Sequence, residues 1–440
     1  MNTNLIYGQL SQTLCGFDPL LKSGRVARIA SMSLESIGPK VPVGEMCILR
    51  DKNGKMVNRA EVVGFRDNKI ISMLLGEGLE IAPGMQIDSS GEALSINLGD
   101  QLVGRVLNGL GEPIDGKAVI KSVTRRPVDA APPNPLLRKR IKTPVHTGIK
   151  AIDGMLTLGE GQRVGIFAGS GVGKSTLLGM LARNTGADVN VIALIGERGR
   201  EVREFIEKDL GKTGLARSVV VVATSDMPAL VRIKAAMTAT TIAEYFRDRG
   251  LNVLLMMDSV TRLAMAQREV GLTIGEPPTT KGYTPSVFSL MQRTMERAGC
   301  GEEGSITGLY TVLVEGDDFN EPISDTARGI LDGHIILSRK LAAKGHYPAI
   351  DVLESISRLR KDVTSREHYV AAGEIQSMLA TYREAEDLIS VGAYQKGTNP
   401  KLDRAIKYYD AIDQFLLQEV DKPNNFEDTV NEMLKIASGK

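Results

Sequence analysis

The stretch that decides the fold reads Ala168-Gly169-Ser170-Gly171-Val172-Gly173-Lys174-Ser175-Thr176. Its glycines let several backbone N–H groups converge on phosphate oxygens, and a helix that begins here points its positive end at the same anion. Lys174 can then reach the β- and γ-phosphates, while the hydroxyl of Ser175 can ligate Mg²⁺. The motif usually begins with glycine. This chain has Ala168 there, which is small enough to leave the phosphate cradle open.

The flanking residues favour a phosphate-binding loop over an ordinary glycine-rich turn. Residues 163–168 form the short apolar run of a buried strand. After the loop, one apolar helix face is formed by Leu177, Leu178, Met180 and Leu181. Strand, loop and helix in this order predict a nucleoside triphosphate site made by Gly169, Ser170, Gly171, Val172, Gly173, Lys174, Ser175 and Thr176.

Composition limits the class of protein. The chain has 440 residues, more than one hydrophobic core usually supports, so two or three domains are expected. Its net charge of +1 provides no basic field for nucleic acid or an anionic membrane. The first lysine is Lys22, unlike in a secretory signal, and no apolar run approaches the ~18 residues that span a bilayer. The spacing of the three cysteines and four histidines predicts no metal site made by these residues. A cytoplasmic protein is expected.

Pattern changes along the chain predict four regions. Residues 1–20 form a leader that is either solvated or a partner-docking segment, with Ile6, Leu10 and Leu14 along one side of a short helix. Residues 21–92 show short β-like runs, and Asn53-Gly54 is a strong hairpin signal between two of them. We therefore expect a β-barrel domain in this second region.

The third region, residues 93–365, is expected to be the nucleotide domain. It includes a connecting region with glycine-rich turns at 104–113 and a proline-rich stretch at 130–135. Apolar runs typical of strands buried in a parallel sheet recur at 189–195, 219–223, 253–257, 309–314 and 335–337. Helical segments such as 229–249 alternate with them, which predicts α/β architecture. The fourth region, residues 366–440, has helical periodicity interrupted at 396–400 and is expected to be a helical domain.

Two carboxylates follow buried strands and are candidates for the chemistry. Asp258 ends an apolar run, where it can hold the Mg²⁺ shell like a Walker B aspartate or simply cap the strand. Glu197 follows another such run and could orient or deprotonate an attacking water. For Glu197 and Arg198, a solvated helix start is an equally good interpretation from pattern alone.

An arginine and a tyrosine remain undecided by pattern. Composition does not separate Arg358 from Arg360 or Arg366 as a catalytic cation. Tyr347 is either a buried core side chain or a ring that stacks on adenine.

These segments together resemble the rotary-type ATPases, the family that contains the catalytic subunits of F-type ATP synthases. The resemblance runs from about residue 20 to residue 420 and rests on Gly196-Glu197-Arg198, on Pro348-Ala349-Ile350-Asp351 and on Ser355-Ile356-Ser357. Within the family, the chain most resembles the flagellar protein-export branch, a relative of the type III secretion ATPases. The segments that carry this are 256–262, 264–269, 275–278, 315–323 and 329–334.

The resemblance implies a RecA-like P-loop nucleotide domain between an N-terminal β-barrel and a C-terminal helical domain. It implies that Glu197 activates water, that Arg198 lies near the γ-phosphate and that Tyr347 packs on adenine. It also implies that Arg358 is an arginine finger acting in trans, with ATP and Mg²⁺ as cofactors. One chain with both loop and finger suits a homohexamer.

The resemblance also implies a function and partners. We expect ATP hydrolysis that energises export of flagellar proteins, at the cytoplasmic face of the export apparatus. The expected partners are a central coiled-coil stalk protein, a stator-like regulatory protein at the N-terminus, the export gate, and export substrates with their chaperones.

Three other functions compete with this interpretation: a virulence-type secretion ATPase, a nucleic-acid-translocating ring motor, and a non-catalytic ring subunit. The presence together of Lys174, Glu197, Asp258 and Arg358 argues against the last of these. The motor needs a basic, aromatic barrel, which residues 24–90 do not provide, so no nucleic acid is expected. Two features depart from the synthase pattern. The segment 393–401 carries Lys396 and Lys401 but no acid, and the leader is short.

Overall fold

The chain divides into two compact units. The computed structural model describes residues 22–30, 32–76, 78, 80–121, 124–314, 316 and 318–438. The first unit contains the chain up to Ser95 together with Thr273–Gly275, and the second contains the remainder. The expected leader at 1–20 lies outside the described residues. The four expected domain ranges therefore stay a prediction. Among the described helices, none is both long enough and apolar enough to cross a membrane.

The first unit contains a closed antiparallel barrel with strand order β1-β2-β5-β4-β3-β6. Its strands are β1 (Ser23–Ala30), β2 (Ser33–Ile37), β3 (Glu45–Arg50), β4 (Met56–Arg66), β5 (Lys69–Leu74) and β6 (Gln86–Ala93). The predicted hairpin is confirmed, because β3 and β4 pair on either side of Asn53-Gly54, with Gly54 at a φ of 79°. Leu34, Leu49 and Ile87 fill the barrel interior.

The second unit is built on a nine-stranded sheet with the path β19-β18-β12-β17-β15-β13-β14-β8 and β16 paired beside β17. Its strands are β8 (Arg105–Asn108), β12 (Arg163–Ala168), β13 (Val189–Ile195), β14 (Ser218–Ala223), β15 (Asn252–Asp258), β16 (Gly299–Cys300), β17 (Ser305–Leu313), β18 (Gly333–Leu337) and β19 (Ile356–Ser357). Strands β8, β12–β15, β17 and β18 pair in parallel, which confirms the α/β prediction.

Strand β8 lies in the region that the sequence suggested was only a connection with turns. It pairs in parallel with β14, from Arg105 opposite Val219 to Asn108 opposite Val222. The strand is short and flanked by glycines, and it occupies one end of the sheet path, so it lacks the long apolar run that marked the other strands.

Four more short strands form two separate pairs: β7 (Ser95–Leu98) pairs with β9 (Thr124–Pro127), and β10 (Pro144–Val145) pairs with β11 (Leu158–Gly159).

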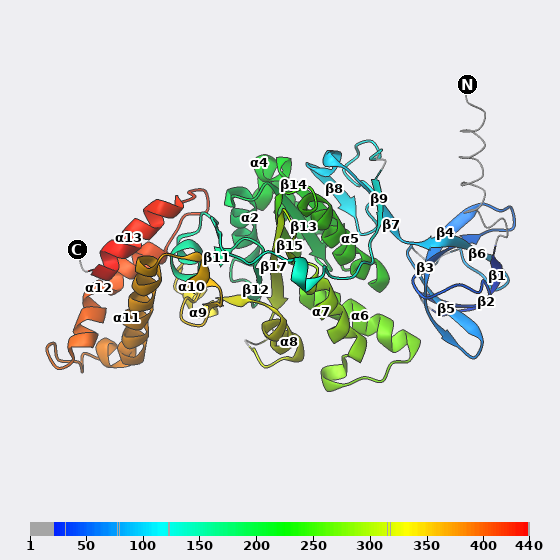
Figure 1. Cartoon of the computed structure of the whole chain (residues 1–440). Helices are drawn as coiled ribbons and strands as arrows, with labels where there is room; N and C mark the ends of the chain where they lie inside the picture. The colour runs from blue at the N-terminus through cyan, green and yellow to red at the C-terminus, as the bar shows by residue number, and fades with distance from the viewer. Residues whose placement is uncertain are drawn as a thin grey trace, which may run out of the picture. The chain divides into compact units, whose positions relative to one another are not determined.

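Helices surround the sheet of the second unit, as Figure 1 shows. They are α2 (Lys174–Asn184), α3 (Gly199–Glu204), α4 (Gly211–Ala216), α5 (Ala229–Arg247), α6 (Val260–Ile274), α7 (Pro285–Glu296), α8 (Pro322–Ile330), α9 (Arg339–Ala343) and α10 (Arg360–Val363). Alternate residues of β12 point to opposite faces. Ile166 joins Leu178 of α2 in the main core, while Phe167 meets Phe319 and His334 instead.

The C-terminal helices are α11 (Arg366–Ser390), α12 (Pro400–Leu416) and α13 (Phe426–Ser438). Helix α11 begins after Ser365, whose side chain accepts a hydrogen bond from the His368 N–H, and α12 begins after Asn399, which caps it in the same way. Ile375 and Phe415 belong to the same hydrophobic core as β12 and α2. The predicted helices and their break are confirmed, and they share one core with the nucleotide-binding sheet.

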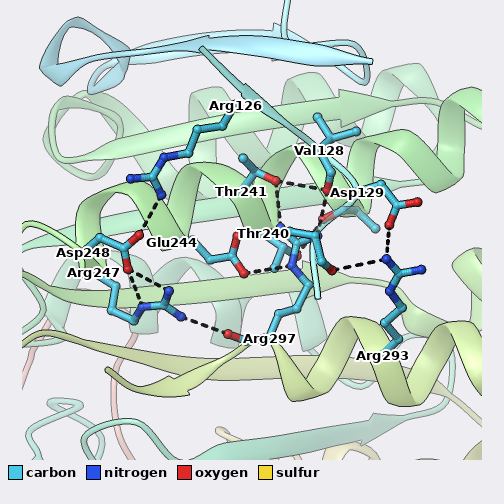
Figure 2. Close-up of polar contacts among 12 residues, drawn as sticks. Arg126, Val128, Asp129, Thr240, Thr241, Glu244, Arg247, Asp248, Arg293 and Arg297 are labelled. Carbon is cyan, nitrogen blue, oxygen red and sulfur yellow. Dashed lines mark hydrogen bonds and ion pairs between the residues drawn. The ribbon is translucent and has the colours of Figure 1, made fainter. Parts of the chain in front are cut away.

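A buried polar network ties the segment after β9 to helix α5 (Figure 2). Arg297 donates to both carboxylate oxygens of Glu244, at 2.8 and 2.6 Å. It also donates to the carbonyl of Val128 at 2.8 Å and to the hydroxyl of Thr241 at 2.8 Å. The side chains of Arg297 and Glu244 are only 2% and 9% exposed. Their hydrogen bonds therefore hold the segment, the helix and the end of α7 together away from solvent.

Because this ion pair is buried, removing one partner should leave an unpaired charge in the interior. We expect Arg297→Ala to lower the free energy of unfolding by about 3–5 kcal/mol, measured by urea titration. The control is Arg293→Ala, which breaks the half-exposed pair with Asp129 in the same network and should cost under about 1 kcal/mol. Equal losses in the two variants would contradict this account.

Candidate functional site

The phosphate-binding loop connects the end of β12 to the start of α2. Gly171 and Gly173 have φ angles of 78° and 84°, left-handed values that favour glycine. Gly173 is the N-cap of α2, so the free N–H groups of the first helical turn face the loop. Backbone amides at Lys174 and Ser175 thus lie where a phosphate is bound by such loops. The local geometry expected from the sequence is present.

A cavity of about 1050 Å³ opens beside this loop. Its walls include most of the predicted nucleotide-binding residues together with Glu197, Arg198 and Tyr347. Ser175 is exposed at this wall, while Val172 is buried beneath the loop. Most of the sequence candidates therefore line one space that is large enough for a nucleotide.

Lys174 joins two carboxylates at the carboxyl edge of the sheet. Its Nζ lies 2.5 Å from Oδ1 of Asp258 and 3.5 Å from Oε1 of Glu197. Asp258 ends β15, Glu197 follows β13, and the two strands pair in parallel, which brings these side chains to the same edge. Burial opposes the charge on Lys174, but the attraction of both carboxylates outweighs it and raises its pKa. Lys174 therefore stays protonated and available to an anion.

The pKa of the Glu197 carboxyl is shifted, as is common for ionisable groups in active sites. Burial raises its pKa above the ordinary 4.5; the charge of Lys174 lowers it, and the charge of Asp258 raises it again. Oδ1 of Asp258 also accepts a hydrogen bond from the Thr311 hydroxyl at 2.6 Å, which fixes this carboxylate. Glu197 therefore takes up a proton more readily than an ordinary glutamate does.

Asp258 and Ser175 provide oxygen donors of the kind that Mg²⁺ prefers. Among the described residues, no three His, Cys, Asp or Glu side chains gather as a metal-binding group. Protein sites for Mg²⁺ commonly use one or two carboxylates and complete the shell with water and substrate phosphates. The oxygen donors beside the loop fit a Mg²⁺ site of this kind. They do not fit a site in which the protein supplies every ligand.

The remaining candidates differ in their position relative to the cavity. The ring of Tyr347 is 43% exposed and packs on the loop, since a Cβ placed on Gly173 would lie 3.4 Å from it. Arg198 is exposed and donates to Glu201 at 3.4 Å. Arg358 lies elsewhere, after β19, where its backbone N–H donates to the carbonyl of Asp332 at 3.1 Å and its guanidinium to the carbonyl of Arg328 at 3.2 Å.

Three residues of the site were not selected from the sequence. Arg262 lines the cavity and packs on Gly196, and its place four residues after Asp258 is the signal that could have identified it. Arg339 lines the cavity two residues after β18, so its position after a strand end is a comparable signal. Thr311 lies within β17 and has no such signal in the sequence.

Comparison with known proteins gives consistent matches over most of the chain. Residues 148–357 match the ATP synthase alpha/beta family, nucleotide-binding domain, and residues 364–435 match the T3SS EscN ATPase C-terminal domain. The chain is 54% identical to the flagellum-specific ATP synthase of Bacillus subtilis (strain 168) over 415 residues, 94% of each protein. It is 53% identical to the type 3 secretion system ATPase of Xanthomonas euvesicatoria over 407 residues, 92% of each.

A solved structure is similar over nearly the whole fold. It is that of the assembled ATPase EscN in complex with its central stalk EscO, from the enteropathogenic E. coli type III secretion system. The TM-score is 0.87 at 44% identity, covering 94% of this chain and 100% of that chain.

The raised pKa of Glu197 means that its ionised form is disfavoured in the folded protein. At a pH above the folded pKa, the ionised carboxylate destabilises the folded protein by the full amount. This destabilisation shrinks as the pH falls toward 4.5, because Glu197 takes up its proton at a higher pH in the folded protein than in the unfolded chain. We expect Glu197→Gln to raise the thermal unfolding midpoint at pH 7 and to lose this gain near pH 4. The control is Glu204→Gln on the exposed face of α3, which should shift little at either pH. A destabilised Glu197→Gln at pH 7 would refute this.

Proposed function

The chain belongs to the ATP synthase alpha/beta family, and we propose that it hydrolyses ATP in a homohexameric ring that energises export of flagellar proteins through a type III secretion apparatus. The observation that carries the proposal is Lys174 held between Asp258 and Glu197 at a phosphate-binding loop. The 54% identity to a flagellum-specific ATP synthase supports the flagellar choice. Because a type 3 secretion system ATPase is 53% identical, a virulence-type export ATPase is the second candidate.

Within this proposal, the residues of the loop bind ATP and the neighbouring charges serve its hydrolysis. Lys174 and the loop amides bind the β- and γ-phosphates, and Tyr347 packs on adenine. Asp258 and Ser175 would hold Mg²⁺, which neutralises phosphate charge when bound. Glu197 orients the attacking water and accepts its proton, a role that a raised pKa suits. Arg198 contacts the γ-phosphate from the rim of the cavity.

Arg358 completes the site of a neighbouring subunit in this proposal. It is exposed outside the cavity that contains Lys174, which is the arrangement expected of an arginine finger acting in trans. The solved relative that is assembled with its central stalk supports a ring with a coiled-coil stalk partner. We place the protein in the cytoplasm, at the face of the export apparatus. Its further proposed partners are a stator-like protein at the N-terminus, the export gate, and export substrates with their chaperones. Nucleic acid is not among the proposed partners.

Loss of the proposed phosphate ligand or water-activating group should abolish turnover. We expect Lys174→Ala and Glu197→Gln each to lower kcat for ATP by about 10²–10⁴-fold, measured by phosphate release. Arg200→Ala, on the exposed side of α3, is the matched control and should keep its rate. Substantial turnover by Glu197→Gln would reject its assigned role.

The same Lys174→Ala change also tests the biological assignment. Introduced in place of the native chain in its source cell, it should abolish flagellar assembly and swimming. Intact swimming with loss of secreted virulence proteins would instead favour the second candidate.

A finger in trans predicts complementation between two inactive chains. Mixing Lys174→Ala with Arg358→Ala should restore activity, because about a quarter of the interfaces in randomly mixed rings pair an intact Lys174 with an intact Arg358. Mixing Lys174→Ala with the Lys174→Ala/Arg358→Ala double variant should restore none. Absence of recovery in rings shown to be mixed would exclude the arrangement in trans.

A further inference from the structure

Two arginines of the cavity, Arg262 and Arg339, belong neither to the predicted site nor to what the comparisons describe, and of the two it is Arg339 that contacts the phosphate-binding loop. Arg339 is the first residue of α9 and follows β18, the parallel neighbour of β12. Leu337 pairs with Ala168, so the chain leaves β18 beside the start of the phosphate-binding loop. The backbone N–H of Ser338 donates to the carbonyl of Ala349 at 2.8 Å, which anchors this strand end.

The guanidinium of Arg339 occupies the space that a side chain on Gly169 would need. A Cβ placed on Gly169 would lie 2.6 Å from both Nε and Nη2 of Arg339, closer than real Cβ atoms approach other atoms. Gly169 does not have the left-handed backbone of Gly171 and Gly173. A side chain at position 169 would therefore meet the guanidinium of Arg339, whereas the backbone φ there does not by itself require glycine.

The segment that contains Arg339 touches the loop at both ends. Arg339 lies against Gly169 at the first turn, and the ring of Tyr347 lies against Gly173 at the last. The backbone of Tyr347 is held in turn, because its carbonyl accepts a hydrogen bond from the N–H of Gln418 at 3.0 Å. Residues 339 and 347 thus contact the two ends of the loop, and both line the cavity.

We propose that Arg339 is a positioning residue of the phosphate-binding loop, and that its contact with Gly169 supports nucleotide binding. The guanidinium packs on the loop backbone and adds a permanent positive charge at the cavity wall, where a triphosphate carries its negative charge. The inference rests on the proposed nucleotide site and adds to it the side chain that holds the first half of the loop.

The proposal predicts that residues 169 and 339 are coupled. Arg339 ends in a flexible side chain, so a methyl group on Gly169 would push it off the loop. We expect Gly169→Ala to weaken binding of N-methylanthraniloyl-ATP with Mg²⁺ by about tenfold, read as the fluorescence Kd. In the Arg339→Ala background the same change should cost about twofold or less, because no guanidinium remains to be displaced.

Gly171→Ala provides the matched control. A Cβ added to Gly171 would have no atom within 4 Å, but the residue has a left-handed backbone, so the cost of this change comes from strain. That cost should be the same with Arg339 or Ala at position 339. Equal costs of Gly169→Ala in the two backgrounds would overturn the proposal.

Two further measurements separate positioning from folding and from the proposed function. Arg339 is exposed, so Arg339→Ala should leave the unfolding midpoint without nucleotide unchanged while raising Kd, and Arg339→Lys should recover part of the affinity through its charge. A lowered midpoint with unchanged Kd would overturn the positioning role. Failure of the unaltered chain to bind the analogue would reject the proposed function itself, whereas binding without coupling rejects only the role of Arg339.

Discussion

The ion pair between Lys174 and Asp258 depends on the register of the parallel sheet. The two residues are 84 positions apart, and their side chains meet because β12, β17, β15 and β13 lie side by side with their carboxyl ends at one edge. Parallel strands need crossover helices, and the helix after β12 starts with Lys174 itself. A shift of one residue in β15 would turn Asp258 to the opposite face of the sheet. The loop, the carboxylates and the cavity therefore share one constraint.

The sequence predicted the elements whose signal is local. Strand β13 was expected at 189–195 and has those bounds, because a strand buried on both faces is a continuous apolar run. Asn53-Gly54 identified the β3–β4 hairpin because few residues tolerate that turn. Strand β8 was missed, since four residues between glycines give no periodicity to read. Asp258 and Glu197 could be selected because strand ends are visible in the pattern.

Other parts of the site depend on contacts between distant segments. Neither the hydrogen bond from Thr311 to Asp258 nor the contact of Arg339 with Gly169 can be predicted from spacing, because each joins residues of segments far apart in the sequence. Tyr347 could not be assigned from composition. Its place depends on the pairing of β18 with β12 and on the hydrogen bond from Gln418. Packing decides such contacts after the backbone register is set.

The separation of Arg358 from the cavity of its own chain has a consequence for counting sites. With the proposed finger in trans, an open row of n subunits contains n − 1 complete sites, because the subunit at one end has no donor. Closing the row into a ring adds one interface and makes the number of sites equal to the number of subunits. Closure therefore adds a whole reaction centre in a single step, and an incomplete ring always leaves one nucleotide pocket without its partner.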